Sequence, residues 1–272
     1  MRWWRGLAGR AGRSAGRDGG GRAPSQRTTG DPPSANGASS LHLFWHLDGH
    51  FAAAEVTLEV LGPPAVDRLY FWALQAAFSD GRRELGAAHL GLQWHPSYPG
   101  STAVNWGGYH RTGGELDGSV SPLPSALGNP NTRDLPWRPT TPYRLRIERG
   151  DTPGAWRGLV IDPATGPVEV RRLYGGGSHL CSLMTWSEVF ARCEHPSVTV
   201  RWSDPVAFAD DGRAHRPATV TVNYQAHDDG GCANTDAFAD ATGLCQRTAT
   251  TRRTPGGSTL AVPRSSGAGD HR

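Results

Sequence analysis

The segment Tyr143-Arg-Leu-Arg-Ile-Glu-Arg149 alternates apolar and charged side chains at almost every step. In an extended chain, Tyr143, Leu145 and Ile147 lie on one face and the charged residues on the other. This period of two is typical of a half-buried antiparallel strand. Residues 219–225 repeat the pattern. The alternation therefore predicts sheets with one face on a core and one face toward solvent.

Similar segments occur along the whole central part of the chain. Further strands are expected at 55–61, 68–78, 89–95, 104–110, 156–162, 168–173 and 198–202. Turns rich in Gly, Pro and Asp separate them, and 36 Gly and 21 Pro in 272 residues argue against long helices. Only 187–192 and 233–241 are expected to form a helical turn. The pattern predicts an all-β fold, an antiparallel β-sandwich or jelly roll.

The first 40 residues differ in composition from the rest. They hold seven Arg against Asp18 and Asp31, whereas the remainder has 21 Arg and 23 acidic residues, and the chain has no Lys. We expect a disordered Arg/Gly-rich tail over 1–40, a sandwich domain over 41–262 and a frayed C-terminus over 263–272. Because its net charge is slightly negative, the body is not a basic nucleic-acid platform.

Two features of the sequence bear on the cellular location of the protein: its cysteines and its N-terminal segment. No apolar run approaches 18 residues, so no membrane span is expected, and no signal peptide is visible, which leaves a cytoplasmic location open. The spacing of the four cysteines predicts two local disulfides, Cys181–Cys193 and Cys232–Cys245, and hence an extracellular setting. Four buried thiols are the alternative. No C-x2-C pair occurs, so a zinc knuckle is not expected, and we predict no metal and no cofactor.

Several segments follow one another in an order that resembles a known family. An aromatic strand, a glycine turn and a "GLQ" strand occupy 69–94, and LPWRPTTPYRLRI occupies 135–147. WRGLVID at 156–162 and LMTWSEVF at 183–190 come after them. This order is similar to a bacterial family known as domain of unknown function 3472, which resembles concanavalin- or laminin-G-like sandwiches. The resemblance implies a fold and an extracellular setting, and brings no activity.

The richest chemical cluster is Gln93-Trp-His95 together with Asn105-Trp-Gly-Gly-Tyr-His-Arg111. If these strands pair as a hairpin, alternate side chains share one face, with either Asn105 and Tyr109 or Trp106 and His110 beside Gln93. Amides beside aromatic rings suit a sugar, whose hydroxyls pair with the amides and whose apolar face lies on a ring. The candidate ligand-binding residues are Gln75, Gln93, His95, Asn105, Trp106, Tyr109 and His110. The alternative is that the aromatic rings pack in the core and the amides tie loops together.

Histidines also recur every four residues at His42, His46 and His50. The Asp48-Gly49 turn interrupts any helix that would gather them into a metal-binding stripe. We interpret them as surface histidines at the edge of the first strand.

The leading functional hypothesis is a non-catalytic, lectin-like module that binds a polysaccharide or cell-wall glycan. No catalytic motif fixes a reaction, since G-x-S-x-G, P-loop and Rossmann fingerprints are all missing. A second hypothesis is a polysaccharide lyase or glycoside hydrolase, with Tyr109 or His110 as base and Arg111 as charge stabiliser. A third is a structural cell-surface domain without a small ligand.

Overall fold

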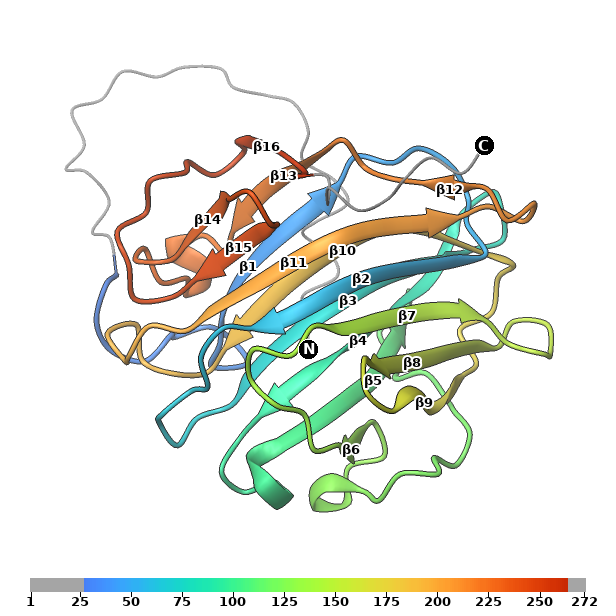
Figure 1. Ribbon diagram of the computed structural model, residues 1–272, viewed down its shortest axis with the longest axis horizontal. Helices are drawn as coiled ribbons and strands as arrows, with labels where there is room; N and C mark the ends of the chain where they lie inside the picture. The colour runs from blue at the N-terminus through green and yellow to red at the C-terminus, as the bar shows by residue number, and fades with distance from the viewer. Residues whose placement is uncertain (1–26, 264–272) are drawn as a thin grey trace.

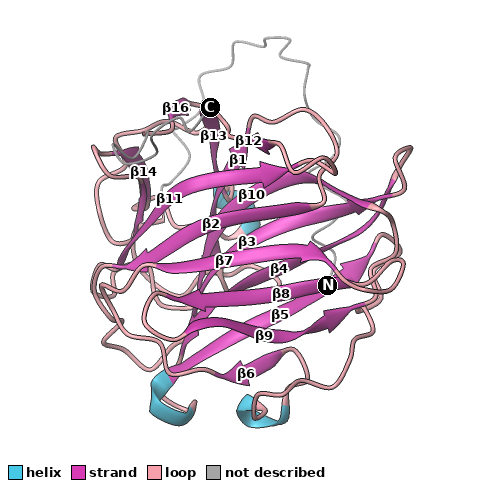
Figure 2. Ribbon diagram, turned by 45° about the vertical axis from the view of Figure 1, so that its right-hand side comes forward, coloured by secondary structure: helices cyan, strands magenta, loops and turns pink. Residues whose placement is uncertain are grey.

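Two antiparallel sheets pack face to face in this computed structural model, which describes residues 27–263 (Figure 1). The strands are β1 (Ser39–Trp45), β2 (Ala53–Val60), β3 (Tyr70–Ser79), β4 (Glu84–Trp94), β5 (Thr102–His110), β6 (Thr132–Asp134), β7 (Tyr143–Arg149), β8 (Trp156–Asp162), β9 (Gly166–Leu173), β10 (His179–Val189), β11 (Thr199–Phe208), β12 (Ala214–His215), β13 (Thr219–Tyr224), β14 (Asp236–Ala239), β15 (Leu244–Arg247) and β16 (Thr259–Ala261). The helical segments are short 3-10 turns, η2 (Pro99–Ser101), η3 (Ala126–Gly128) and η4 (His227–Asp229), drawn in cyan in Figure 2. The fold is the all-β sandwich expected from the alternation.

The strand order defines two sheets. The β1 sheet runs β16-β13-β1-β10-β3-β4-β5-β6, and the β2 sheet runs β14-β15-β11-β2-β7-β8-β9, with β12 paired to β11. At three of the four edges the last strand has only three or four residues, namely β16, β6 and β14. At the fourth edge, β9 carries Pro167 near its start.

The core lies between the sheets and is dominated by large aromatic side chains. Trp72, Trp106, Trp156 and Trp202 are all fully buried there. Trp106 of the β1 sheet lies directly against Gly158 of the β2 sheet, where an added Cβ would be 2.7 Å from the indole Cγ. Glycine is therefore needed at this point for the two sheets to approach each other.

The prediction of a helical turn is partly wrong for both segments, 187–192 and 233–241. Residues 187–189 continue β10, and 236–239 form β14. The cause in β10 is the same alternation as elsewhere: Ser187 faces the core while Trp186 and Glu188 face outward. Hydrogen bonding to β1 and β3 on either side outweighs the local helical preference of so short a segment.

The ordered domain also begins earlier than expected. The described chain starts at Arg27, and residues before β1 already make specific contacts, such as the Gly30 N–H to Glu194 and the Asn36 amide to Glu188. The expected boundary at residue 40 is therefore too late. Residues 1–26 and 264–272 lie outside the described part of the chain.

The predicted cysteine pairing is wrong, although a disulfide is present. Cys193 bonds to Cys232, with Cα atoms 5.6 Å apart, while Cys181 and Cys245 are free thiols. The predicted partner Cys181 lies near the start of β10, and Cys193 lies beyond its end. The stretch of β10 from Cys181 to Val189 alone spans about 26 Å, so the two cysteines are too far apart for a disulfide. Cys245 is buried in β15, where its thiol lies 3.4 Å from Asp240.

We expect the Cys193–Cys232 bond to contribute much of the stability. It closes a 39-residue separation, and the chain-entropy model assigns such a loop about 4 kcal/mol. Cys193→Ser together with Cys232→Ser should lower the free energy of unfolding by that order in urea titrations, while Cys181→Ser should change it little. Peptide mapping without reduction should recover the 193–232 pair. Recovery of a 181–193 peptide instead would contradict the assignment.

Candidate binding site

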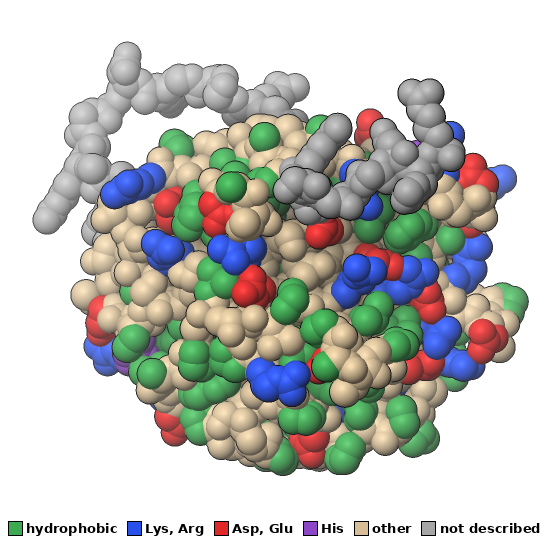
Figure 3. All heavy atoms as spheres, in the orientation of Figure 1, with side chains coloured by type: hydrophobic (Ala, Val, Ile, Leu, Met, Phe, Trp, Pro, Cys, Tyr) green, Lys and Arg blue, Asp and Glu red, His purple; other side chains and the backbone are tan. Residues whose placement is uncertain are grey.

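The two outer faces of the sandwich differ in chemistry. The outer face of the β2 sheet, toward the viewer in Figure 3, carries interleaved acidic and arginine side chains. Glu55, which is buried, pairs with Arg144 and Arg146, and Glu148 pairs with Arg146 and Arg157. Because each of these carboxylates has arginine partners, this face is an ion-pair ladder.

The outer face of the β1 sheet is almost uncharged by comparison. Five neighbouring strands of this sheet, β1, β10, β3, β4 and β5, contain no arginine, although the chain has 28. Their only acidic residues are Glu84, at the start of β4, and Glu188 on β10. The rest of this face consists of Met184 and of aromatic, amide, imidazole and small side chains.

A compact group on this face, which we call the aromatic–amide face, is centred on Trp186. In register, Trp186 on β10 lies beside His42 on β1 and Ala73 on β3, and the same row continues to Asn105 on β5. The indole ring lies 4.8 Å from the Phe71 ring, 5.6 Å from the His89 ring and 6.4 Å from the His42 ring, measured between centroids. The aromatic–amide face comprises His42, Phe71, Gln75, His89, Gln93, Asn105 and Trp186.

Hydrogen bonds fix the orientation of its polar side chains. The Trp186 Nε1–H donates to Gln75 Oε1 at 2.9 Å. The Asn105 amide donates to Thr132 at 2.9 Å, and the Tyr98 hydroxyl donates to Gln93 Oε1 at 3.0 Å. The planar groups are thus held in place without a ligand.

Two polar atoms of the aromatic–amide face have no hydrogen-bond partner among the described residues. They are His42 Nδ1 and Asn105 Oδ1, both buried. The Asn105 oxygen lies close enough to His89 to favour the protonated imidazole slightly, yet it does not accept a well-formed hydrogen bond. An unsatisfied buried polar atom costs about 1–3 kcal/mol, so both atoms favour a ligand or a water that can pair with them.

Both histidines of this face are neutral at ordinary pH. Burial lowers the pKa of His42 to about 4 and the pKa of His89 to about 4. Each imidazole therefore offers one donor and one acceptor and no charge.

Two ionisable groups lie at opposite ends of the face. Burial raises the pKa of the Glu188 carboxyl, and burial together with the charges of Glu115 and Glu188 raises the pKa of the Tyr109 phenol. Both shifts disfavour the charged form of the group.

The structure brings together part of the predicted site. Gln75, Gln93 and Asn105 share the aromatic–amide face, and Tyr109 has the same orientation on β5. The sequence left open whether Asn105 and Tyr109 or Trp106 and His110 share a face with Gln93. In the structure, Asn105 and Tyr109 share that face.

Three predicted ligand-binding residues are not on this face. Trp106 is fully buried in the core, so its assignment to a ligand site is wrong; strand alternation directs it inward, next to Asn105. His95 lies past the end of β4 beside Asp67 and Tyr98. His110 has the opposite orientation from Tyr109 at the end of β5, and the exposed Arg111 lies in the following turn. The proposed catalytic set of Tyr109, His110 and Arg111 therefore does not converge.

Sequence reasoning missed Trp186, His89, His42 and Phe71 as parts of this site. Trp186 and Phe71 alternate with core residues on β10 and β3, and that alternation was a usable signal. His42 was expected at a strand edge, yet it lies in the interior of the sheet, because β13 and β16 continue the sheet beyond β1.

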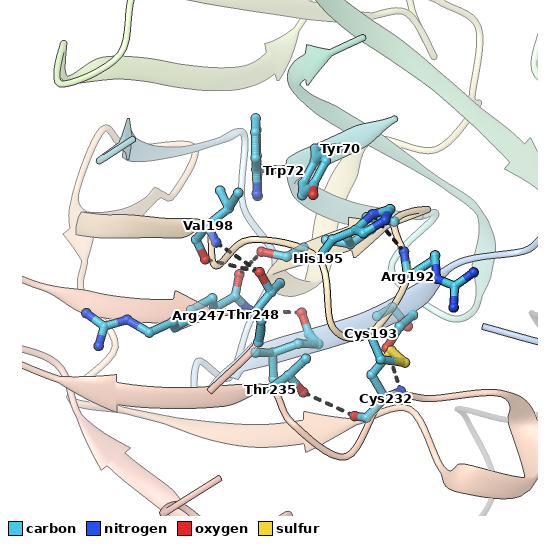
Figure 4. Close-up of a pocket in the computed structure, with 18 residues that line it drawn as sticks. Tyr70, Trp72, Arg192, Cys193, His195, Val198, Cys232, Thr235, Arg247 and Thr248 are labelled. Atoms are coloured by element: carbon cyan, nitrogen blue, oxygen red, sulfur yellow. Dashed lines mark hydrogen bonds between the residues drawn. A yellow bond between two sulfur atoms is a disulfide. The ribbon is translucent and has the colours of Figure 1, made fainter. Parts of the chain in front are cut away.

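A separate small pocket lies between the sheets near the disulfide (Figure 4). Tyr70, Trp72 and Val198 line it, with the disulfide at one end. Its polar groups are largely paired: Ser187 donates to Gln246 at 2.6 Å, and the Val198 N–H donates to Thr248 at 3.0 Å. We interpret this pocket as part of the core packing.

Comparison with known proteins finds likenesses only at the level of structure. No family model matches the sequence, and no curated protein matches it, so the resemblance to family 3472 stays a prediction. The similar structures include Scytalido-glutamic peptidase with a peptide-based transition state analog, at 10% identity and TM-score 0.44, covering 81% of this chain and 99% of that one. Another is SCP-B of the Eqolisin family of peptidases in complex with the tripeptide Ala-Ile-His, at 10% identity and TM-score 0.42, covering 81% and 99%. The alginate lyase from Klebsiella pneumoniae has 10% identity and TM-score 0.24 over 57% and 58%. At these values we transfer no function.

Within residues 27–263, no cluster of three or more His, Cys, Asp or Glu side chains is arranged to hold a metal ion. In the same range, no helix is long and apolar enough to cross a bilayer.

We expect Trp106→Ala to act on stability. Trp106 is fully buried against Gly158, and removing a fully buried indole typically costs about 3–5 kcal/mol. Urea titration followed by circular dichroism should show a loss of that size. A loss below 1 kcal/mol would contradict the position of Trp106 between the sheets.

We also expect acid to weaken the fold through His42 and His89. Their folded pKa values near 4 lie below the usual value of 6.5, so the unfolded chain binds more protons between these limits. The free energy of unfolding should therefore fall as the pH drops from 6.5 toward 4, by about 1–3 kcal/mol for each imidazole. Glu188, with its raised pKa, acts in the opposite sense.

The measurement is the thermal midpoint at pH 7 and pH 4.5, for the natural chain and for His42→Asn with His89→Asn. The variant should lose less on acidification. An equal loss in both proteins would show that other groups govern the acid response.

Proposed function

We propose that the protein is a carbohydrate-binding, lectin-like module that binds an extended glycan on the aromatic–amide face. The observation that carries the proposal is a pair of unsatisfied polar atoms in the row of Trp186: His42 Nδ1, one strand from Trp186, and Asn105 Oδ1, three strands away in the other direction. Sugar hydroxyls both donate and accept hydrogen bonds, so they suit neutral imidazoles and amides.

The composition of the face favours a ligand of mixed polarity. Trp186 and Phe71 form an apolar aromatic cluster that is only 6% and 5% exposed, and Gln75 keeps its amide N–H groups after accepting the indole N–H. Aromatic rings beside a few fixed polar groups are typical of small-molecule and sugar sites. Because the histidines are neutral and arginine is missing from these strands, the face does not favour polyanions such as nucleic acid.

We favour binding over catalysis on geometric grounds. Glycoside hydrolysis uses two carboxylates roughly 5–9.5 Å apart. Glu84 and Glu188 are in register with Ser79 and Phe71 of β3, eight residues apart on that strand, or about 26 Å. The lyase hypothesis needs Tyr109 beside Arg111, which occupies the turn after β5.

An extracellular setting belongs to the same proposal. Disulfides persist in oxidising compartments, and Cys193–Cys232 supports such a location. The bond joins the segments after β10 and before β14, close to one end of the aromatic–amide face.

The test is a glycan array on the full chain, followed by calorimetry on the best ligand with Trp186→Ala. We expect binding to weaken at least tenfold, because the variant loses the ring platform and frees Gln75 from its orienting partner. His42→Phe provides a second variant, which removes the unsatisfied nitrogen but keeps an aromatic ring.

Tyr174→Ala is the matched control, since Tyr174 is an aromatic residue 48% exposed just beyond β9 of the β2 sheet. Its binding should equal that of the natural chain. The proposal fails if no glycan binds, or if Trp186→Ala folds and binds unchanged.

A further inference from the structure

Glu188 lies at one end of the aromatic–amide face, in the row across the sheet that contains Phe71 and Gln93. It extends from β10 beside Phe71 and Ser40, its neighbours in register on β3 and β1. Its only hydrogen bond found in the described structure comes from the Asn36 amide to Oε1, at 2.7 Å. No arginine or histidine among the described residues lies within ion-pairing distance of it.

Comparable carboxylates on the outer face of the β2 sheet are, in contrast, paired with arginine. Glu55, Glu59, Glu148 and Glu169 are similarly shielded from solvent, and each contacts at least one arginine. A shielded carboxylate without a cation is unfavourable, because desolvation is not offset by attraction. The fold could have placed an arginine near Glu188, yet strands β1, β3, β4, β5 and β10 contain none.

Since no cationic side chain of residues 27–263 pairs with Glu188, a ligand can supply the cation. We propose that the glycan bound on this face carries amino groups, and that Glu188 pairs with the ammonium of an amino sugar. This inference rests on the proposed function and names its ligand class.

The surroundings of Glu188 fit an ammonium on a sugar ring. Phe71, in register beside it, is part of the aromatic cluster that would carry the apolar sugar face. The Asn36 amide occupies Oε1, which leaves Oε2 for the ligand. In the same row across the sheet, Asp134 on β6 has a buried oxygen without a partner, and it offers a second acidic position for a chain that crosses the strands.

The row from Glu188 to Asp134 runs through Phe71, Gln93 and Ala103. Four strand intervals of about 4.8 Å give it a length of about 19 Å. A short linear oligosaccharide has this reach, so one ligand can contact both acidic residues and the Phe71 ring between them.

The test compares three β-1,4-linked hexasaccharides that differ at one substituent: cellohexaose, N-acetylchitohexaose and fully deacetylated chitohexaose. Calorimetry on the full chain at pH 6, where the sugar amines carry charge, should show at least tenfold tighter binding of the deacetylated hexamer. Raising the salt from 50 to 300 mM should weaken this binding and leave cellohexaose unaffected.

Glu188→Gln is the decisive variant, because an amide can still accept the Asn36 hydrogen bond. It should remove the preference, so that the deacetylated hexamer and cellohexaose bind this variant equally tightly. Glu84→Gln is the matched control, since Glu84 lies at the far end of the same sheet and accepts a hydrogen bond from Ser182 at 2.6 Å. Its preference should equal that of the natural chain.

The outcomes separate the two proposals. Equal binding of all three hexamers, or a preference that survives Glu188→Gln, would overturn the amino-sugar inference and leave glycan binding standing. Failure of every glycan to bind, on the array and here, would remove the proposed function itself. Tighter binding of a hexa-arginine peptide than of the deacetylated hexamer would overturn the inference in favour of a basic protein partner.

Discussion

The packing of tryptophans between the two sheets is the constraint on which the rest of the structure depends. Trp106 and Trp156 come from opposite sheets, and each is accommodated by close contact with the other sheet: Trp106 lies against Gly158, and Trp156 stacks on Phe78 at 5.3 Å. With these side chains inside, strand alternation directs their neighbours outward. Asn105 and His89 are therefore on the aromatic–amide face as a consequence of which residues fill the core.

The two outer faces use opposite means to hold polar groups in place. On the β2 sheet, carboxylates and arginines neutralise one another across neighbouring strands. On the β1 sheet, amides and indole are held by neutral hydrogen bonds, and some capacity for hydrogen bonding is left over. Leftover capacity beside apolar rings is what distinguishes a recognition surface from a solvated exterior. This asymmetry supports placing the site on the β1 sheet.

Local alternation was enough to predict the strands, and to predict that Gln75 and Gln93 face outward, because a period of two is set within a few residues. It left the register of β5 against β4 open, and a shift of one residue exchanges Asn105 for Trp106. Alternation within β10 directs Trp186 outward, but it does not show which residues lie beside it, because its neighbours on β3 and β1 are more than a hundred residues away in sequence. The prediction of the disulfide was wrong for a related reason. It assumed that cysteines close in sequence are close in space, whereas β10 separates Cys193 from Cys181.

The short strands at the sheet borders have a consequence for how copies of the molecule meet. An unpaired border strand is a template on which another chain can extend the sheet, the route by which β proteins aggregate. Here β16, β6 and β14 offer only three or four residues each, and Pro167 removes a backbone donor from β9. The borders of both large sheets therefore template poorly, so the protein should resist edge-to-edge association at high concentration.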